Sequence, residues 1–236
     1  MELTPNRGDC FSLLGLARDL NAFYSPNDPL PLFEDDIENL EIEFENLSED
    51  FCPKICFLEI EIDSIPQIYN ENLSSYFEKL EIKRNNFFTD VSNYISYEMG
   101  QPTHCFDKSK INKKLIFMRK ECDEDFHTLL DSKIKLEGKN GVFLLDNEII
   151  SIAGVMGGKS TSCSTNTKKV LVECAYFEPE LMIGKSTKYN LSSDSAHKFE
   201  RGVDPSIQEK ALRRFVKIVE EHSNIKNLKM SYQIFY

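Results

Sequence analysis

The stretch KKVLVECAYF, residues 168–177, places a single carboxyl group, that of Glu173, inside an apolar run that is typical of a β-strand. Strand alternation divides the run between two faces, with Val170, Val172 and Cys174 on one and Leu171, Glu173 and Ala175 on the other. If other elements cover both faces, Glu173 lies in apolar surroundings and must be hydrogen-bonded or neutral. An edge strand that holds Glu173 in solvent is the alternative, and the pattern alone favours neither.

Short strand-like runs surround this stretch, and helical patterns lie outside them. Runs typical of strands occupy residues 52–63, 113–120, 132–138, 141–146 and 148–158, and a hairpin turn is expected at residues 146–147. Apolar residues recur at helical spacing before residue 100 and again between residues 207 and 219. This arrangement favours an α+β fold, with a mixed or antiparallel β-sheet core and helices gathered toward both chain ends.

Polar residues and a glycine predict where the helices begin and end. We expect Asp9 to cap the first helix, Thr89 to cap a later one, and Asp204 to cap the last. Gly100 predicts the end of the helix that precedes it. His104 then follows on what we expect to be a short, stiff loop.

The composition is ordinary for a globular protein, with 41% hydrophobic and 28% charged residues among 236. A net charge of −11 argues against a protein that coats nucleic acid. No apolar run is long enough to span a bilayer, so we expect no membrane association. Seven cysteines without a signal-peptide pattern predict reduced thiols and a cytoplasmic location.

The glycine-rich segment AGVMGGKS, residues 153–160, lacks the four-residue spacing of a Walker motif. We therefore expect close backbone approach there, to a ligand or to another strand, in place of an ATP site. No second cysteine pair complements Cys52 and Cys56, and the adjacent His104 and Cys105 cannot easily face one metal centre. We expect no metal site, while a Cys–His nucleophile pair stays open.

Four longer motifs, in order, carry a resemblance to a known family. They are LTPNRGDCFSLLGLARDL (residues 3–20), TDVSNYISYEMGQPTHCFDKSKI (89–111), IAGVMGGKSTSCSTNTKKVLVECAYFEP (152–179) and HKFERGVDP (197–205). With these motifs the chain resembles the bacterial-type phenylalanyl-tRNA synthetase β subunit. The similar part of that family is its editing domain, formed by the third and fourth modules of the β chain.

The resemblance implies a domain organisation, an activity and partners. It implies one compact editing domain of two interleaved modules at residues 1–224, and the start of a linker to a missing downstream module at residues 225–236. The implied activity is hydrolysis of the ester of tyrosine mischarged onto tRNA(Phe), within a parent enzyme that performs ATP-dependent aminoacylation. The implied partners are the acceptor end of tRNA(Phe), tyrosine as editing ligand, and the synthetase α subunit in an α2β2 assembly. No cofactor is implied for this domain, because ATP and magnesium would bind elsewhere in the synthetase.

The resemblance also implies roles for individual residues. Glu173 matches the glutamate that reads the tyrosine hydroxyl, and His104 matches the histidine that holds the ester end and helps to place water. The implied catalytic residues are His104, Ser193 and Asn93, and the implied substrate-binding residues are Glu173, Gly154, Gly157, Ser92 and Ser195.

Ser195 departs from the family, in which alanine is usual at this position. The added hydroxyl can narrow the pocket or offer the phenol a second partner. This departure keeps a second function open, that of a non-catalytic tRNA-binding or assembly module of the synthetase with weak or lost editing. A third possibility is a free-standing deacylase that acts on other aminoacyl-tRNAs.

Overall fold

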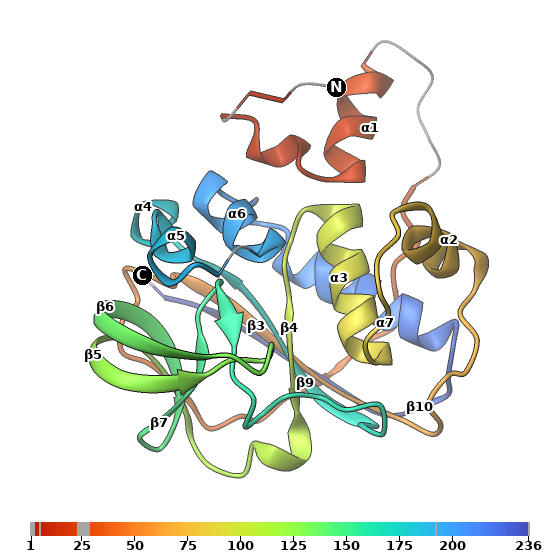
Figure 1. The fold of residues 1–236 in the computed structure, drawn as a ribbon. Helices are drawn as coiled ribbons and strands as arrows, with labels where there is room; N and C mark the ends of the chain where they lie inside the picture. The colour runs from red at the N-terminus through yellow and green to blue at the C-terminus, as the bar shows by residue number, and fades with distance from the viewer. Residues whose placement is uncertain (1–2, 5, 23–28, 192, 236) are drawn as a thin grey trace.

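Helices flank a pair of β-sheets in the computed structural model, which describes residues 3–4, 6–22, 29–191 and 193–235 (Figure 1). The helices are α1 (Leu13–Asn21), α2 (Glu71–Lys79), α3 (Phe87–Met99), α4 (Pro179–Met182), α5 (Lys185–Tyr189), α6 (Asp194–Arg201) and α7 (Gln208–Glu220), with short 3-10 helices η1 (Gly8–Cys10) and η2 (Lys108–Lys110). The strands are β1 (Glu38–Asn39), β2 (Phe44–Asn46), β3 (Lys54–Ile62), β4 (His104–Asp107), β5 (Leu115–His127), β6 (Lys133–Leu145), β7 (Glu148–Ile152), β8 (Met156–Gly157), β9 (Lys169–Tyr176) and β10 (Ile225–Ile234). None of the described helices is long and apolar enough to cross a membrane.

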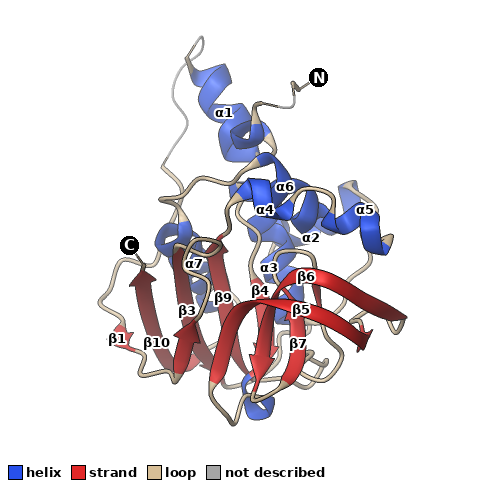
Figure 2. Ribbon diagram, turned by 90° about the vertical axis from the view of Figure 1, so that its left-hand side faces the viewer, coloured by secondary structure: helices blue, strands red, loops and turns tan. Residues whose placement is uncertain are grey.

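Two five-stranded sheets form the centre of the fold (Figure 2). The central sheet has the strand order β1-β10-β3-β9-β4, in which β1 is parallel to β10 and the other neighbours are antiparallel. The second sheet has the order β2-β5-β6-β7-β8, with a parallel β2–β5 pair and antiparallel neighbours otherwise. Both sheets are therefore mixed, and the expected α+β class is confirmed.

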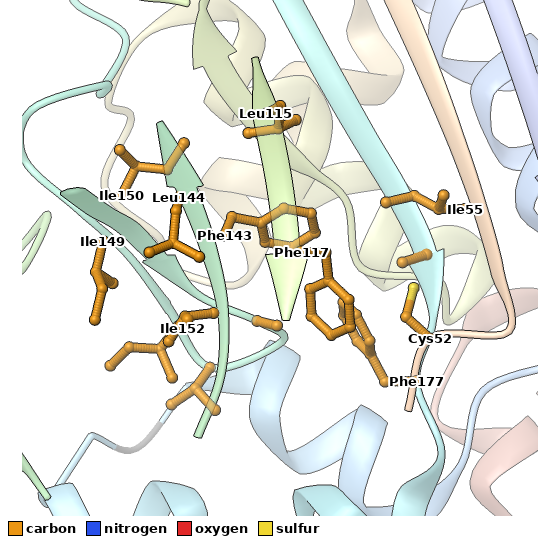
Figure 3. Packing of buried hydrophobic residues seen from close by; sticks show 14 of the residues in the cluster. Cys52, Ile55, Leu115, Phe117, Phe143, Leu144, Ile149, Ile150, Ile152 and Phe177 are labelled. Carbon is orange, nitrogen blue, oxygen red and sulfur yellow. The ribbon is translucent and has the colours of Figure 1, made fainter. Parts of the chain in front are cut away.

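The elements stack in three layers, with the central sheet in the middle (Figures 1 and 2). One hydrophobic cluster lies between the central sheet and helices α3 and α7, and it includes Leu58, Phe88 and Phe215. A second cluster lies between the two sheets and includes Ile55 and Phe117 (Figure 3). The central sheet therefore buries both of its faces.

Strand β9 lies between β3 and β4, so it is an interior strand of the central sheet. The alternation expected from the sequence is confirmed, with Val170, Val172 and Cys174 in the helix-side cluster and Leu171 and Ala175 in the cluster between the sheets. Glu173 is 5% exposed. The alternative of an edge strand with Glu173 in solvent is therefore wrong.

The C-terminal segment differs from the sequence expectation. A linker was expected at residues 225–236, but residues 225–234 form strand β10. This strand pairs with β3 from Ile225 opposite Ile62 to Ile234 opposite Lys54. Leu228, Met230, Tyr232 and Ile234 alternate with polar residues, which is typical of a strand, and Leu228 and Met230 pack against the helix-side cluster.

Two helix starts are also displaced from their expected positions. Ser12 caps α1 in place of Asp9, and its side chain accepts a hydrogen bond from the backbone of Gly15. Asn86 caps α3 in place of Thr89, whose backbone N–H donates to the Asn86 side chain. In both cases another polar residue within one turn satisfies the free backbone donors, which propensity alone does not decide.

The other expected boundaries give mixed outcomes. Gly100, at φ 77°, ends α3 as expected. Asp204 caps only a turn before α7, in which its carboxylate accepts from the backbone N–H of Ser206. The strands expected at 132–138 and 141–146 are one strand, β6, and the expected hairpin turn at residues 146–147 is confirmed.

Candidate functional site

A cavity of about 380 Å³ lies where α3, β4, β9, the β7–β8 turn and the start of α6 meet. All eight residues that the resemblance implies line it: Ser92 and Asn93 of α3, His104 of β4, Gly154 of the β7–β8 turn, Gly157 of β8, Glu173 of β9, and Ser193 and Ser195 at the start of α6. The fold therefore brings together groups that are far apart in the sequence. Their chemical roles stay predictions.

Glu173 and His104 lie directly opposite each other on neighbouring antiparallel strands. The sequence expectation placed His104 on a loop, whereas it is the first residue of β4. Residues in this relation share one face of the sheet, with Cβ atoms about 4.5–5.5 Å apart. Burial raises the pKa of Glu173 to about 8, and hydrogen bonding to the backbone of Ala175 offsets only part of that effect. At neutral pH the Glu173 side chain is therefore mostly a neutral carboxylic acid.

The imidazole of His104 is neutral and incompletely hydrogen-bonded. Burial lowers the pKa of His104 to about 4. Its ring packs edge-to-face on Phe106, with ring centroids 4.4 Å apart. Its Nε2 atom is buried and has no hydrogen-bond partner among the described residues. Such orphaned atoms are uncommon in folded proteins, and one in a cavity wall indicates a place for water or a ligand.

A side chain would not fit at either of the two cavity glycines, for a different steric reason at each. At Gly157 a Cβ atom would lie 2.4 Å from Cε1 of His104 and 2.8 Å from Cδ1 of Leu129. Gly154 has φ +66°, and a Cβ atom there would lie 2.6 Å from Cε of Met182. Gly157 therefore makes room for the imidazole of His104, and Gly154 makes the turn that carries it.

The two α3 residues differ in how free their side chains are. The hydroxyl of Ser92 lies 2.7 Å from both the carbonyl oxygen and the hydroxyl of Thr103. Asn93 is partly exposed, and its carboxamide makes no hydrogen bond within the described part of the chain. Asn93 is thus the α3 side chain that is available to a ligand, whereas Ser92 positions Thr103.

Ser193 and Ser195 tie the start of α6 to the β7–β8 turn. The Ser193 hydroxyl donates to the carbonyl of Val155 at 3.0 Å and accepts from the N–H of Ala196 at 3.1 Å, which makes it the N-cap of α6. The Ser195 hydroxyl donates to the carbonyl of Gly154 at 3.2 Å. Both hydroxyl groups are therefore already engaged in holding the cavity wall together.

The β5–β6 turn supplies a further cavity wall that lies outside the four motifs. Leu129 and Leu130 line the cavity, and the backbone N–H of Leu129 donates to the carbonyl of Gly157 at 2.9 Å. Leu130 is 70% exposed. Two leucines inside the polar turn TLLDS were the available signal, because exposed large apolar residues mark binding surfaces.

The cysteines near the site do not form a nucleophile pair with His104. Cys105 belongs to the helix-side cluster, because neighbouring residues on a strand point to opposite faces. Burial raises the pKa of Cys105 well above its usual value and that of Cys163 to about 12. Neither thiol is ionised at neutral pH, so neither is an activated nucleophile.

One group of potential metal ligands occurs in the described part of the chain, formed by Asp9, Cys10 and Asp19, whose ligand atoms lie within 4.8 Å of one another. Arg7 donates to both carboxylates, and Arg18 also pairs with Asp9. The Arg7 guanidinium lowers the pKa of Asp9 to about 2. These carboxylates are therefore neutralised by arginines and form an ion-pair cluster that joins η1 to α1.

Known proteins resemble the chain over most of its length. A model of the B3/4 domain family matches residues 60–224. The phenylalanine–tRNA ligase β subunits of Francisella tularensis (strain SCHU S4) and Legionella pneumophila (strain Lens) are 31% and 33% identical to it, over 94% and 93% of this chain. The chain spans 28% of the length of each of these relatives.

A solved structure shares the fold. It is an N-terminal fragment of the phenylalanyl-tRNA synthetase β subunit from Pyrococcus horikoshii, with a TM-score of 0.50 and 14% identity. The match covers 96% of this chain and 60% of that one. The resemblance that the four motifs carry is confirmed, and the chain belongs to the B3/4 domain family.

Proposed function

We propose that this chain is the editing domain of a phenylalanine–tRNA ligase β subunit and that it hydrolyses the ester of tyrosine mischarged onto tRNA(Phe). The observation that carries the proposal is a cavity in which the buried carboxyl group of Glu173 lies opposite the imidazole of His104, whose Nε2 has no partner among the described residues. Aminoacylation, with its ATP and magnesium, belongs in this proposal to other parts of a cytoplasmic α2β2 enzyme. The names and extent of the relatives support this assignment.

Selectivity for tyrosine follows from the burial of Glu173. A phenolic hydroxyl and a neutral carboxyl group can each donate and accept one hydrogen bond, so the two groups can pair reciprocally. Phenylalanine would leave the carboxyl group buried without that partner, at a cost of about 1–3 kcal/mol. We therefore expect tyrosine to bind about 5- to 150-fold more tightly than phenylalanine.

Hydrolysis needs a water molecule placed at the ester carbonyl and a group that takes its proton. The imidazole of His104 is neutral, and its buried Nε2, which has no partner among the described residues, can accept a hydrogen bond and a proton from that water. The water oxygen bonds to the carbonyl carbon, the bond from that carbon to the ribose oxygen breaks, and the proton passes through His104 to the departing oxygen. The products are tyrosine and a tRNA with a free terminal hydroxyl. An aminoacyl ester is reactive, so positioning and modest polarisation suffice.

Of the remaining polar groups, one contacts the substrate and the others position neighbouring residues of the cavity wall. Asn93 offers its free carboxamide to the amino or carbonyl group of the substrate. Ser92 acts through Thr103, and Ser193 acts through the N-cap of α6. In this proposal only Asn93 and His104 touch the ester end, and Ser193 holds the wall beside it.

The binding test uses calorimetric titration of the full chain with tyrosine and then with phenylalanine. Wild type should prefer tyrosine, and Glu173→Ala should remove that preference. Glu61→Ala is a suitable control, because Glu61 is a partly exposed carboxylate of the same sheet outside the cavity. Equal binding of the two amino acids by folded wild type would contradict the proposal.

The catalytic test follows deacylation of tyrosyl-tRNA(Phe) with the protein in excess, because a chain with a net charge of −11 should bind tRNA weakly. His104→Ala should slow the reaction about 10²- to 10⁴-fold, the usual contribution of a general base. Tyrosine binding without deacylation would favour the non-catalytic assembly module. The argument for that alternative was that the Ser195 hydroxyl can obstruct the pocket or pair with the phenol. It is weakened because this hydroxyl already donates to the carbonyl of Gly154.

A further inference from the structure

A second cavity, of about 510 Å³, adjoins the cavity that holds Glu173 and His104. Six residues line both cavities: Ser92, Asn93, Pro102, Thr103, Ser193 and Ser195. Glu173 and His104 line only the first. A ligand whose side chain reaches Glu173 and whose other end passes the shared residues therefore continues into the second cavity.

The residues that line only the second cavity make it aromatic and apolar on one side. Tyr76 of α2 and Tyr97 of α3 lie there with ring centroids 4.9 Å apart. Leu80 and Ile82, which follow α2, are 46% and 37% exposed. Large apolar side chains left in solvent beside partly buried rings are typical of a ligand groove.

The charges of the second cavity argue against a phosphate ligand. Its one lysine among the described lining residues is Lys198, and this ammonium group is already paired. The Nζ atom lies 2.7 Å from the carbonyl oxygen of Ser96, 2.9 Å from the Ser96 hydroxyl and 2.8 Å from the Asp194 carboxylate. Asp194 is itself 70% exposed and would repel an anion. The cavity therefore favours a flat, uncharged aromatic group.

We propose that the second cavity binds the terminal nucleoside of the aminoacylated RNA, with the base against Tyr76, Tyr97, Leu80 and Ile82. This inference rests on the proposed function, because it requires an aminoacyl ester of RNA in the first cavity. The ester bond then lies at the shared residues, beside the free carboxamide of Asn93. Stacking on aromatic rings tolerates any base, so this contact adds affinity without reading the tRNA sequence.

The test compares two non-hydrolysable ligands of the full chain. One is tyrosinamide, and the other is 3′-(L-tyrosylamino)-3′-deoxyadenosine, in which an amide replaces the ester. The adenosine conjugate should bind about 5- to 150-fold more tightly, as expected for one stacked base. Tyr97→Leu should remove most of that gain and leave tyrosinamide affinity unchanged, whereas Tyr97→Phe should keep the gain.

A second variant guards against a folding defect at Tyr97, which also packs on other rings of α2 and α3. Leu80→Ser combined with Ile82→Ser alters two exposed side chains and should likewise reduce the gain. Leu20→Ser on α1 is the matched control, since Leu20 is 47% exposed and lines neither cavity. This control should bind both ligands as wild type does.

Failure of this inference is distinguishable from failure of the proposed function. The inference is overturned if the conjugate binds wild type no better than tyrosinamide, or if the gain survives both Tyr97→Leu and the double variant. The proposed function fails instead if tyrosinamide and phenylalaninamide bind equally. Adenosine alone gives an independent readout, because it should shift the methyl NMR signals of Leu80 and Ile82 in wild type. Unshifted methyl signals at saturating adenosine would also overturn the inference.

Discussion

Two carboxyl groups of this protein are buried to nearly the same degree but have different partners. Glu98 of α3 is 6% exposed and Glu173 of β9 is 5% exposed. Glu98 accepts hydrogen bonds from Nε and Nη2 of Arg214 at 2.7 and 2.9 Å, and from the hydroxyl of Tyr94 at 3.0 Å. Glu173 has no cation among the described residues as a partner and lies opposite the neutral His104.

In the proposed function, the difference separates a carboxyl group that holds the fold from one that binds the substrate. The Glu98–Arg214 pair joins α3 to α7, and its hydrogen bonds compensate for the removal of both charges from water. Burial of Glu173, in a cavity wall, is compensated mainly by retention of its proton. Each of the following predictions tests either the pairing of Glu98 or the role of Glu173 and its cavity.

The largest effect is expected from Arg214→Ala. Loss of the guanidinium leaves Glu98 buried without its partner, which should lower the free energy of unfolding by about 3–5 kcal/mol. Urea unfolding followed by circular dichroism measures this change. Lys217→Ala, on the exposed side of the same helix, should cost about 0.5 kcal/mol or less. If both variants lowered the free energy of unfolding equally, the Glu98–Arg214 pair would not hold the fold as proposed.

The next effect concerns how stability depends on pH through Glu173. The folded pKa of about 8 lies above the unfolded value of about 4.3, so the folded state keeps a proton that the unfolded state has already lost. Wild-type stability should therefore fall relative to Glu173→Gln as the pH rises from about 5 to 8, by up to about 1.4 kcal/mol per pH unit. Below about pH 3 both states are protonated and the difference in stability should stop changing.

Urea unfolding of wild type and Glu173→Gln at each pH gives this difference directly, because contributions from all other groups cancel. The same series with Glu61→Gln is the control, since Glu61 is partly exposed and pairs with Lys169. Parallel profiles for wild type and Glu173→Gln would mean that Glu173 ionises normally in the folded protein. The reciprocal pairing with a phenol would then lose its basis.

A third prediction changes the wall behind His104. Gly157→Ala places a methyl group 2.4 Å from Cε1 of His104, so the imidazole must move away from its position opposite Glu173. Deacylation of tyrosyl-tRNA(Phe) should slow by about 100-fold, as misplacement of a catalytic group by about 1 Å does. Tyrosine binding, measured by calorimetry, should change much less. A deacylation rate within twofold of wild type would exclude His104 as the group that takes the proton.

The sequence predicts part of the surroundings of Glu173 and none of those of Glu98. The alternation in β9 predicts the faces of its residues, but only β3 and β4, one on each side, make Glu173 interior. The resemblance supplies the residues of the first cavity, whereas their mutual geometry depends on the register that pairs His104 with Glu173. The Glu98–Arg214 pair joins residues 116 positions apart, and no local pattern connects them.

Strand β10 lies in residues that the resemblance implied to be the start of a linker, although Leu228, Met230, Tyr232 and Ile234 alternate with polar residues as in a strand. The second cavity depends on contacts between separate elements, which no local pattern displays. Tyr76 and Tyr97 come from different helices, and each reads alone as an ordinary residue of an amphipathic face.

The smallest effect is expected from Ser195→Ala, which installs the alanine that the resemblance predicts at this position. The Ser195 hydroxyl already donates to the carbonyl of Gly154, so its loss should lower the free energy of unfolding by about 0.5–1.5 kcal/mol. The preference for tyrosine over phenylalanine should stay within about twofold of wild type, because in this geometry Glu173 and not Ser195 reads the phenol. Ser193→Ala, which also removes the N-cap of α6, is the comparison that should cost more stability. A several-fold rise in tyrosine preference on Ser195→Ala would instead mean that this hydroxyl obstructs the pocket. Selectivity for tyrosine would then depend on both Glu173 and Ser195. The burial of Glu173 without an arginine partner, which distinguishes it from Glu98, would not by itself explain the selectivity.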